Sequence, residues 1–332
     1  MSPISELTYA PAWWVPGPHF QTLWGKLARR VPPDRTRSER WTTPDGDEIE
    51  LRRQDAPAST LGTPPRLLIL HGLEGTIRSH YLRGLLDQAR QRGWAADVMI
   101  FRGCDGTLNR ARRMYHSGET SDIEFVVRRL LGEHPEQQLV LVGVSLGGNV
   151  LLKWLGERGA NMPGLVRAAA AISVPFDLER GARHIERGVS QIYTRHFLRS
   201  LRAKAIAKLK QYPGLFDLAA LDGARTLYDF DDAVTAPVHG FSSARDYYAR
   251  SSSLSFLSGI RRPTLLLSAY DDPFLPSDVL DRVAGVAQTN RALVIEFVPK
   301  GGHVGFVSGR TPFHTRYYAE ERALEFLASE IG

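Results

Sequence analysis

The sequence predicts an α/β fold in which a mostly parallel, doubly wound sheet is flanked by helices and carries a helical cap insertion. Three observations lead to this prediction. Short apolar runs recur along the chain, helix-like patterns separate them, and the alternation stops between Val174 and Thr264. Alternating strands and helices are typical of a sheet whose two faces are covered by helices.

Six apolar runs are expected to be strands because they are short and rich in branched residues. Strands of a parallel sheet are buried on both faces and are therefore apolar nearly throughout. The expected strands are residues 66–72, 95–101, 138–144, 168–174, 264–270 and 292–298.

Three stretches between or after these runs have the spacing of amphipathic helices. In the stretch 121–131, apolar residues repeat at helical intervals, and Ser121 and Glu124 have the spacing of a capping box. The stretch that follows Ser277 and the one that begins at Ala319 repeat in the same way.

The interruption after Val174 predicts the domain organisation. We expect residues 1–175 and 262–332 to form the α/β core and residues 176–261 to form a helical cap. The first part of this insertion is basic: residues 176–210 hold nine basic and three acidic residues, a net charge of +6 that equals the net charge of the whole chain. The insertion contains no convincing buried strand.

Composition excludes several classes of protein. The 332 residues include one cysteine, Cys104, so an intramolecular disulfide and a multi-cysteine metal site are excluded. No secretory signal is apparent, and no apolar run approaches the roughly 20 residues of a membrane-spanning helix. We therefore expect a cytoplasmic protein with no cofactor and no metal; its oligomeric state is left open.

The stretch "GVSLG" (Gly143 to Gly147) is the first candidate catalytic feature. It matches the G-x-S-x-G pattern at the end of an expected strand and the start of an apolar helix. In such a turn the serine is strained and presents its hydroxyl above the sheet, while the glycines allow strand and helix to approach. We identify Ser145 as the candidate nucleophile; the alternative is a tight turn with a small polar residue.

A nucleophilic serine needs a base, and the base needs an acid to orient it. The elbow predicts the order serine, acid, histidine. His303 follows the last expected strand and is the candidate base, whereas His314 lies close to the last helix. The candidate acids are Asp272, Asp271 and, after an earlier strand, Asp177. Asp272 is favoured because the acid in folds of this kind usually stands four residues before a proline, here Pro276.

Two backbone N–H groups are expected to stabilise the oxyanion of the tetrahedral intermediate. One belongs to Leu146, the residue after the candidate nucleophile, and the other to Leu73, in the loop "LHGLEG" that follows an earlier strand. His71 is expected to shape this loop rather than to take part in the chemistry. Cys104 is expected to be a packed thiol, because no base is apparent for it.

With these motifs the sequence resembles the α/β-hydrolase superfamily. The stretches "HFQTLWG" (His19 to Gly25), "FRGCDGTLNR" (Phe101 to Arg110) and "YHSGETSD" (Tyr115 to Asp122) are further similar to hallmarks of its YheT-like group. The resemblance runs from about residue 10 to the C-terminus. It implies a serine esterase or lipase-like activity, with Ser145, Asp272 and His303 as the triad and acyltransferase activity in some relatives.

The expected function is hydrolysis of a small-molecule carboxylic ester, of short to medium acyl chain or a lipid, through an acyl-serine intermediate. The alternatives are an acyltransferase that uses the same intermediate and a non-catalytic binding protein on a hydrolase scaffold. Nucleic-acid binding is not expected, because the basic segment lacks stacking aromatics and a recognised motif.

The basic cap suggests one further partner, an anionic membrane surface at the inner face of a membrane. Apolar residues from Phe176 to Leu201 recur at roughly helical spacing, and arginines and lysines fall between them. Under this hypothesis Arg199, Arg202 and Lys204 face the lipid and salt weakens binding. The alternative is a solvated helical face with no lipid role.

Overall fold

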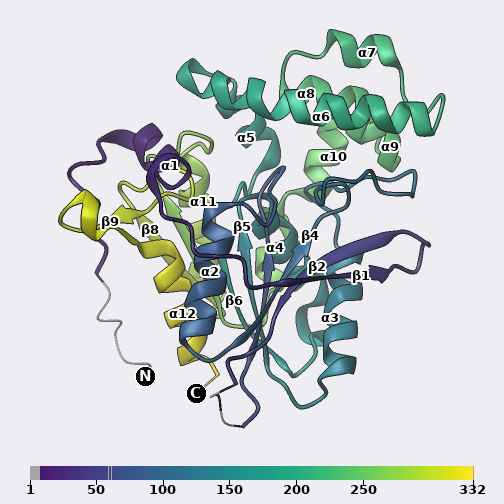
Figure 1. The fold of residues 1–332 in the computed structure, drawn as a ribbon. Coiled ribbons are helices and arrows are strands. Elements are labelled where there is room, and N and C mark those ends of the chain that lie inside the picture. Colours follow the sequence, from purple (N-terminus) through teal and green to yellow (C-terminus); the bar gives the residue numbers. More distant parts are fainter. Residues whose placement is uncertain (1–7, 59, 61, 332) are drawn as a thin grey trace.

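A central sheet of eight strands organises the molecule (Figure 1). The structure is a computed structural model that describes residues 8–58, 60 and 62–331. The strand order is β1-β2-β4-β3-β5-β6-β7-β8. The strands are β1 (Arg37–Thr42), β2 (Glu48–Gln54), β3 (Arg66–Leu70), β4 (Ala95–Ile100), β5 (Leu139–Val144), β6 (Val166–Ile172), β7 (Thr264–Ala269) and β8 (Leu293–Val298).

The six strands from β3 to β8 are parallel to one another and confirm the six expected strands. The strands β1 and β2 add an antiparallel edge that the apolar pattern did not predict. Both are rich in charged residues, and β1 at the edge buries only Trp41. A strand with one exposed face does not read as a continuous apolar run.

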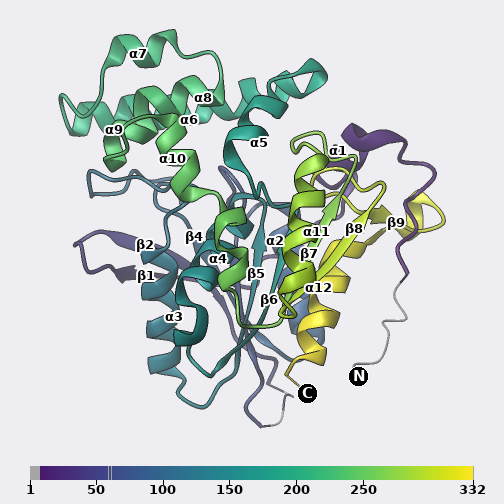
Figure 2. The ribbon, with the colours of Figure 1, turned by 180° about the vertical axis from the view of Figure 1, so that it is seen from behind.

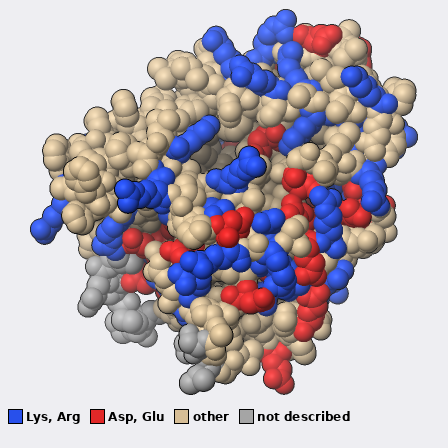
Figure 3. Space-filling view, in the orientation of Figure 1, with Lys and Arg blue, Asp and Glu red and all other residues tan. Residues whose placement is uncertain are grey.

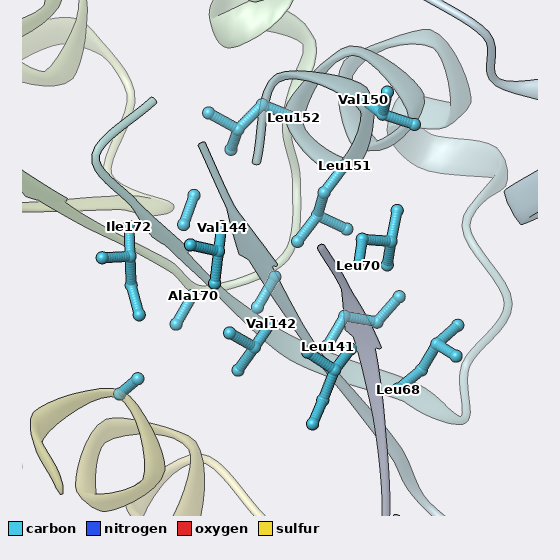
Figure 4. Packing of buried hydrophobic residues seen from close by; sticks show 14 of the residues in the cluster. Leu68, Leu70, Leu141, Val142, Val144, Val150, Leu151, Leu152, Ala170 and Ile172 are labelled. Carbon is cyan, nitrogen blue, oxygen red and sulfur yellow. The ribbon is translucent and has the colours of Figure 1, made fainter. Parts of the chain in front are cut away.

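Helices cover both faces of the sheet, which confirms the expected fold class (Figures 1 and 2). On one face α2 (His80–Gln91) packs against α12 (Tyr318–Ser329). The other face carries α3 (Ser121–Glu133), α4 (Leu146–Arg158) and α11 (Asp278–Thr289), and α1 (Gly17–Ala28) lies next to α2. Figure 4 shows the core between β3, β5, β6 and α4, where Leu70, Val142 and Leu151 are fully buried.

The predicted capping box of α3 is wrong. The N-cap residue is Thr120, without a side-chain cap, and the Ser121 hydroxyl donates instead to Glu119. Glu124 does not turn back to the start of its own helix: its carboxylate accepts from Trp154 Nε1 at 2.8 Å and pairs with Arg158. It therefore links α3 to α4, because a tertiary partner replaces the local one.

Between β6 and β7 the chain forms helices that lie above the carboxyl ends of the parallel strands (Figure 1). They are α5 (Leu178–Ile185), α6 (Gln191–Gln211), α7 (Leu218–Gly223), α8 (Leu227–Phe230), α9 (Ala236–His239) and α10 (Ala244–Ser251). We call these helices the cap. The expected division at residues 176 and 261 stays a prediction; Phe176, Leu257 and Ile260 pack within the main core.

The basic segment is two helices rather than one continuous amphipathic helix. A turn at Gly188–Ser190 separates α5 from α6, with Gly188 at a φ of 55°. Within the expected apolar face, Leu198 and Leu201 are buried, whereas Val189 and Ile192 are exposed. These apolar residues therefore do not form one continuous face, because the chain changes direction between the two helices; Ile185, Phe197 and Leu201 do line a cavity.

Several basic residues of the cap are not part of a solvated face. Lys208 is fully buried, and its Nζ donates to the carbonyl oxygens of Asn109 at 2.6 Å and Ala111 at 2.8 Å. Lys204 pairs with Glu74 of the core. Figure 3 shows the lysines and arginines that remain on the surface in this view.

The outward charges of α6 are Arg195, Arg199 and Lys210. The membrane hypothesis stays a prediction. Of the three residues that it names, Arg199 is exposed, Arg202 donates to the Ala224 carbonyl oxygen and Lys204 pairs with Glu74. Among the described residues, no helix is long and apolar enough to cross a membrane.

Candidate active site

Ser145 stands between β5 and α4, in the sharp turn that the sequence predicts. Its backbone has φ 54° and ψ −119°, a conformation that strains any residue with a Cβ atom. Gly147 follows where α4 crosses the end of β3, and a Cβ there would lie 2.5 Å from the carbonyl oxygens of Leu70 and His71. The turn therefore requires glycine at this position and exposes the serine hydroxyl.

Ser145, His303 and Asp272 form one hydrogen-bonded chain. His303 Nε2 lies 2.9 Å from Ser145 Oγ, and His303 Nδ1 lies 2.8 Å from Asp272 Oδ2. Because an ionised carboxylate only accepts, Nδ1–H donates to Asp272 and leaves Nε2 free to accept the serine proton. Asp272 and His303 are both buried, which protects this chain from competing water.

Asp271 has a different place. Its Oδ1 accepts the backbone N–H groups of Gly301 at 2.8 Å and Gly302 at 2.9 Å, just before His303. Burial, with the neighbouring Asp272 as a lesser cause, raises the pKa of Asp271. Of the two aspartates, Asp272 contacts the imidazole and Asp271 holds the loop that carries it.

The histidine loop also rests on α1, far away in the sequence. Thr22 Oγ1 accepts from the His303 N–H at 2.9 Å, and Gln21 Oε1 accepts from the Val307 N–H at 2.8 Å. Gly302 has a φ of 60°, and a Cβ there would lie 2.5 Å from the Pro18 carbonyl oxygen. The stretch "HFQTLWG" thus positions His303, a role that the sequence analysis did not assign.

The two expected oxyanion donors both border the cavity above Ser145. No hydrogen bond from the N–H of Leu73 or Leu146 to another described group is found. The loop of Leu73 lies against the serine, since a Cβ on Gly72 would be 3.3 Å from Ser145 Cβ. The Gly72 N–H donates to the Tyr81 hydroxyl at 2.9 Å, which fixes the loop.

His71 shapes this loop, as expected. Its Nε2 accepts from the Phe101 N–H at 3.1 Å, so Nδ1 carries the proton and donates to the Gly72 carbonyl at 2.7 Å. Burial lowers the pKa of His71 to about 4, which keeps the ring neutral near neutral pH. With both nitrogens engaged, this imidazole is not free to act on a substrate.

A second support of the loop comes from the cap. Glu74, next to Leu73, has a φ of 56°, and its backbone N–H donates to the Tyr115 hydroxyl at 3.1 Å. The Glu74 carboxylate accepts from Tyr115 and from Lys204 of α6, each at 2.7 Å. The cap is therefore bonded directly to the residue beside a candidate oxyanion donor.

Cys104 lies beside this cluster as a buried thiol. Burial raises the pKa of its thiol to about 11, so it stays protonated near neutral pH. Its Sγ lies 3.4 Å from Lys204 Nζ. The expected packed thiol fits this position.

The stretches "FRGCDGTLNR" and "YHSGETSD" mainly build scaffold. Buried Arg102 pairs with Asp47 and Asp122, each at 2.7 Å, and so joins the end of β4 to the edge of the sheet and to α3. Arg113 extends the network to Asp122 and Glu119. These contacts order the loop below the cap.

A cavity of about 290 Å³ opens over Ser145 between core and cap. Its wall includes Ser145, Leu146 and His303 from the core, and α5, α6 and the segment 227–239 from the cap. Most side chains on the wall are apolar, Ile185 and Phe230 among them. Within the described part of the chain, no group of three or more His, Cys, Asp or Glu side chains is arranged to hold a metal ion.

The sequence is similar to those of known alpha/beta hydrolases. Residues 65–309 match the family model described as alpha/beta hydrolase fold. The chain is 39% identical to "Putative esterase YheT" of Escherichia coli (strain K12), over 94% of this chain and 91% of that protein.

More distant relatives carry lipase names. Phospholipase ABHD3 of Mus musculus is 29% identical over 95% of this chain and 77% of its own length. Monoacylglycerol lipase of Saccharomyces cerevisiae (strain ATCC 204508 / S288c) is 31% identical over 86% of this chain and 63% of its own length. Among solved structures, an esterase of Pyrococcus furiosus, Pf2001, has a TM-score of 0.58 at 16% identity, covering 91% of this chain and 98% of that one, a likeness in fold.

Proposed function

Because the chain belongs to the alpha/beta hydrolase fold family and to its YheT-like group, we propose that it cleaves carboxylic esters through an acyl-serine intermediate. The observation that carries this proposal is the hydrogen-bonded chain of Ser145, His303 and Asp272 at the floor of a largely apolar cavity. The relatives named esterase, phospholipase and monoacylglycerol lipase support an ester substrate.

The proposed reaction has two halves. His303 Nε2 takes the hydroxyl proton as Ser145 Oγ attacks the carbonyl carbon, and the N–H groups of Leu73 and Leu146 stabilise the resulting oxyanion. The imidazolium then protonates the departing alcohol, which leaves the acyl group on Ser145. Water, deprotonated by His303, attacks the acyl carbon, and the imidazolium returns the proton to Ser145 Oγ as the acid leaves. Asp272 keeps the imidazole in the required tautomer throughout.

An ester series tests the proposed substrate class. With p-nitrophenyl esters from acetate to palmitate, kcat/KM should rise with chain length, because each buried methylene contributes up to about 0.8 kcal/mol. The rise should stop at a short to medium chain, where the cavity of about 290 Å³ is filled. Equal kcat/KM for all chain lengths, or no cleavage of any ester, would contradict the proposal.

The contact between cap and oxyanion loop gives a second prediction. Lys204→Met removes the partner of Glu74, whose strained backbone then holds Leu73 less firmly. We expect kcat to fall roughly ten- to hundredfold, as small misplacements of catalytic groups do, with a smaller change in KM. Lys204→Arg should restore part of the loss, since arginine keeps the charge.

Lys208→Met is the matched control. This residue stands one turn later on the same helix and also bonds cap to core, but to carbonyl oxygens in the 109–111 loop. It should lower the thermal stability while kcat, per folded molecule, falls less than in Lys204→Met. Equal losses of kcat in the two variants would mean that cap anchoring alone matters and would refute a specific role for the Glu74 contact.

A further inference from the structure

The helical segment that closes the cavity from the cap side carries two rows of side chains, one apolar and one polar. It consists of α8, a π-helical turn (Asp231–Thr235) and α9. Phe230, Val234 and Val238 form an apolar row at intervals of four residues. Asp231, Thr235 and His239 form a polar row beside it, and all six residues border the cavity. π-helical turns are rare and often mark functional sites.

Part of the polar row is internally bonded. Asp231 accepts from the Thr235 hydroxyl at 2.5 Å and from the Tyr248 hydroxyl at 2.6 Å. Burial raises the pKa of Asp231 to about 6, and these two hydrogen bonds oppose the rise. Asp231 thereby holds the hydroxyl groups of Thr235 and Tyr248 in place.

The rest of the row keeps hydrogen-bonding capacity open. His239 has no hydrogen bond to a described group, and its ring lies 4.4 Å from that of His116, which also borders the cavity. His116 Nδ1 accepts from the Gly118 N–H, so in the neutral ring Nε2 carries the proton. Glu119 Oε2 lies 3.9 Å from this nitrogen, beyond hydrogen-bond distance. Because both rings border the cavity, these nitrogens can bond to a group that lies in it.

Among the described residues, the wall of the cavity carries no cationic side chain here, although Arg113 is close enough to add to the effect of burial in lowering the pKa of both imidazoles. Burial lowers the pKa of both imidazoles, that of His239 to about 4, so both rings are neutral near neutral pH. No lysine or arginine is among the described residues that border the cavity. A phosphate group in the cavity would meet Asp231 with no cationic side chain on the wall, which is unfavourable for a buried anion.

The cluster is also close to the nucleophile. Ser117, next to His116, is held through its carbonyl oxygen by Asn149 Nδ2 at 2.7 Å. Asn149 stands one turn of α4 after Ser145, and its own N–H donates to the Ser145 carbonyl at 3.1 Å. A substrate bound at Ser145 can therefore reach the polar row without leaving the cavity.

We propose that His239 and His116 bind an uncharged, hydroxyl-bearing group of the ester substrate, while the apolar row holds its hydrocarbon chain. This inference rests on the proposed ester hydrolysis at Ser145. The hydroxyl can belong to a polyol that leaves as the alcohol or to a hydroxylated acyl chain. In either position it bonds to the imidazole nitrogens that the protein leaves open.

Four esters of one chain length test the proposal: ethyl decanoate, monodecanoylglycerol, ethyl β-hydroxydecanoate and decanoylglycerol phosphate. For the unmodified protein, kcat/KM for one hydroxylated ester should exceed that for ethyl decanoate, and the favoured one identifies the source of the hydroxyl. His239→Leu should lower this ratio roughly tenfold, the effect of one lost hydrogen bond. The phosphate ester should be the poorest substrate.

Controls separate this proposal from the general function. His239→Gln should retain most of the preference for the favoured hydroxylated ester over ethyl decanoate, because an amide still donates and accepts. Val238→Ala should change kcat/KM for these two esters by the same factor. A ratio unchanged in His239→Leu, no preference for either hydroxylated ester, or a preference for the phosphate ester would overturn the proposal while ester hydrolysis stands. If the protein cleaves neither ethyl decanoate nor any other ester, the proposed ester hydrolysis itself is refuted.

Discussion

Replacing Ser145 with alanine should lower the rate of ester hydrolysis by roughly four to six orders of magnitude, as loss of the nucleophile does in other triads. His303 and the oxyanion donors remain in this variant, but no oxygen is left to form the acyl-enzyme. The measurement is kcat for a p-nitrophenyl ester, with enzyme concentration fixed by active, folded protein.

Unfolding does not explain such a loss, because alanine fits the site. Serine already occupies the strained conformation at φ 54°, and among the described residues its hydroxyl is hydrogen-bonded to His303 alone. Circular dichroism and the thermal unfolding midpoint should therefore stay close to those of the unmodified protein. Cys104→Ala is the control for an alternative nucleophile and should retain most of the activity. Near-normal turnover by a folded Ser145→Ala protein would contradict the assignment of Ser145 as the nucleophile.

Asp272→Asn should cost about four orders of magnitude in kcat, as the corresponding change does in another triad. The Phe274 N–H donates to Asp272 Oδ1 at 2.8 Å and needs an oxygen there. The amide NH₂ of asparagine must then face His303 Nδ1. This places the proton of the neutral imidazole on Nε2, where it can no longer accept the proton of Ser145.

Asp271→Asn is the matched comparison. The asparagine carbonyl oxygen can still accept from the N–H groups of Gly301 and Gly302, so the loss should be far smaller. Asp271→Ala removes that acceptor and should lose more, through displacement of the loop that carries His303. If Asp271→Asn loses more activity than Asp272→Asn in folded proteins, the orienting acid is Asp271.

The parallel core could be predicted from the sequence because burial on both faces makes its strands apolar. The run from Leu139 to Val144 is fully buried and reads as one apolar block. The edge strand from Arg37 to Thr42 exposes most of its side chains, and tertiary partners rather than sequence period decide its conformation. The same holds for Glu124, whose partner Trp154 lies on another helix.

The hydrogen-bonded chain of Ser145, His303 and Asp272 could be predicted because each member follows the end of a strand, in a fixed order along the chain. The residues that hold these side chains in place could not be predicted from the sequence. Thr22 meets His303 across most of the sequence, and Lys204 meets Glu74 from within the cap. No local pattern signals such pairs. The polar row from Asp231 to His239 was missed for a related reason, since a π-helical turn departs from the ordinary helical period.

Covalent labelling with a fluorophosphonate probe tests the central claim most directly. A probe of this kind reacts with a serine that its base activates, so mass spectrometry of the digested protein should find the adduct on the peptide that contains Ser145. Labelling should be absent in Ser145→Ala and strongly slowed in Asp272→Asn. An adduct on another residue, or ester hydrolysis by a protein whose Ser145 is never labelled, would contradict the assignment of Ser145 as the nucleophile.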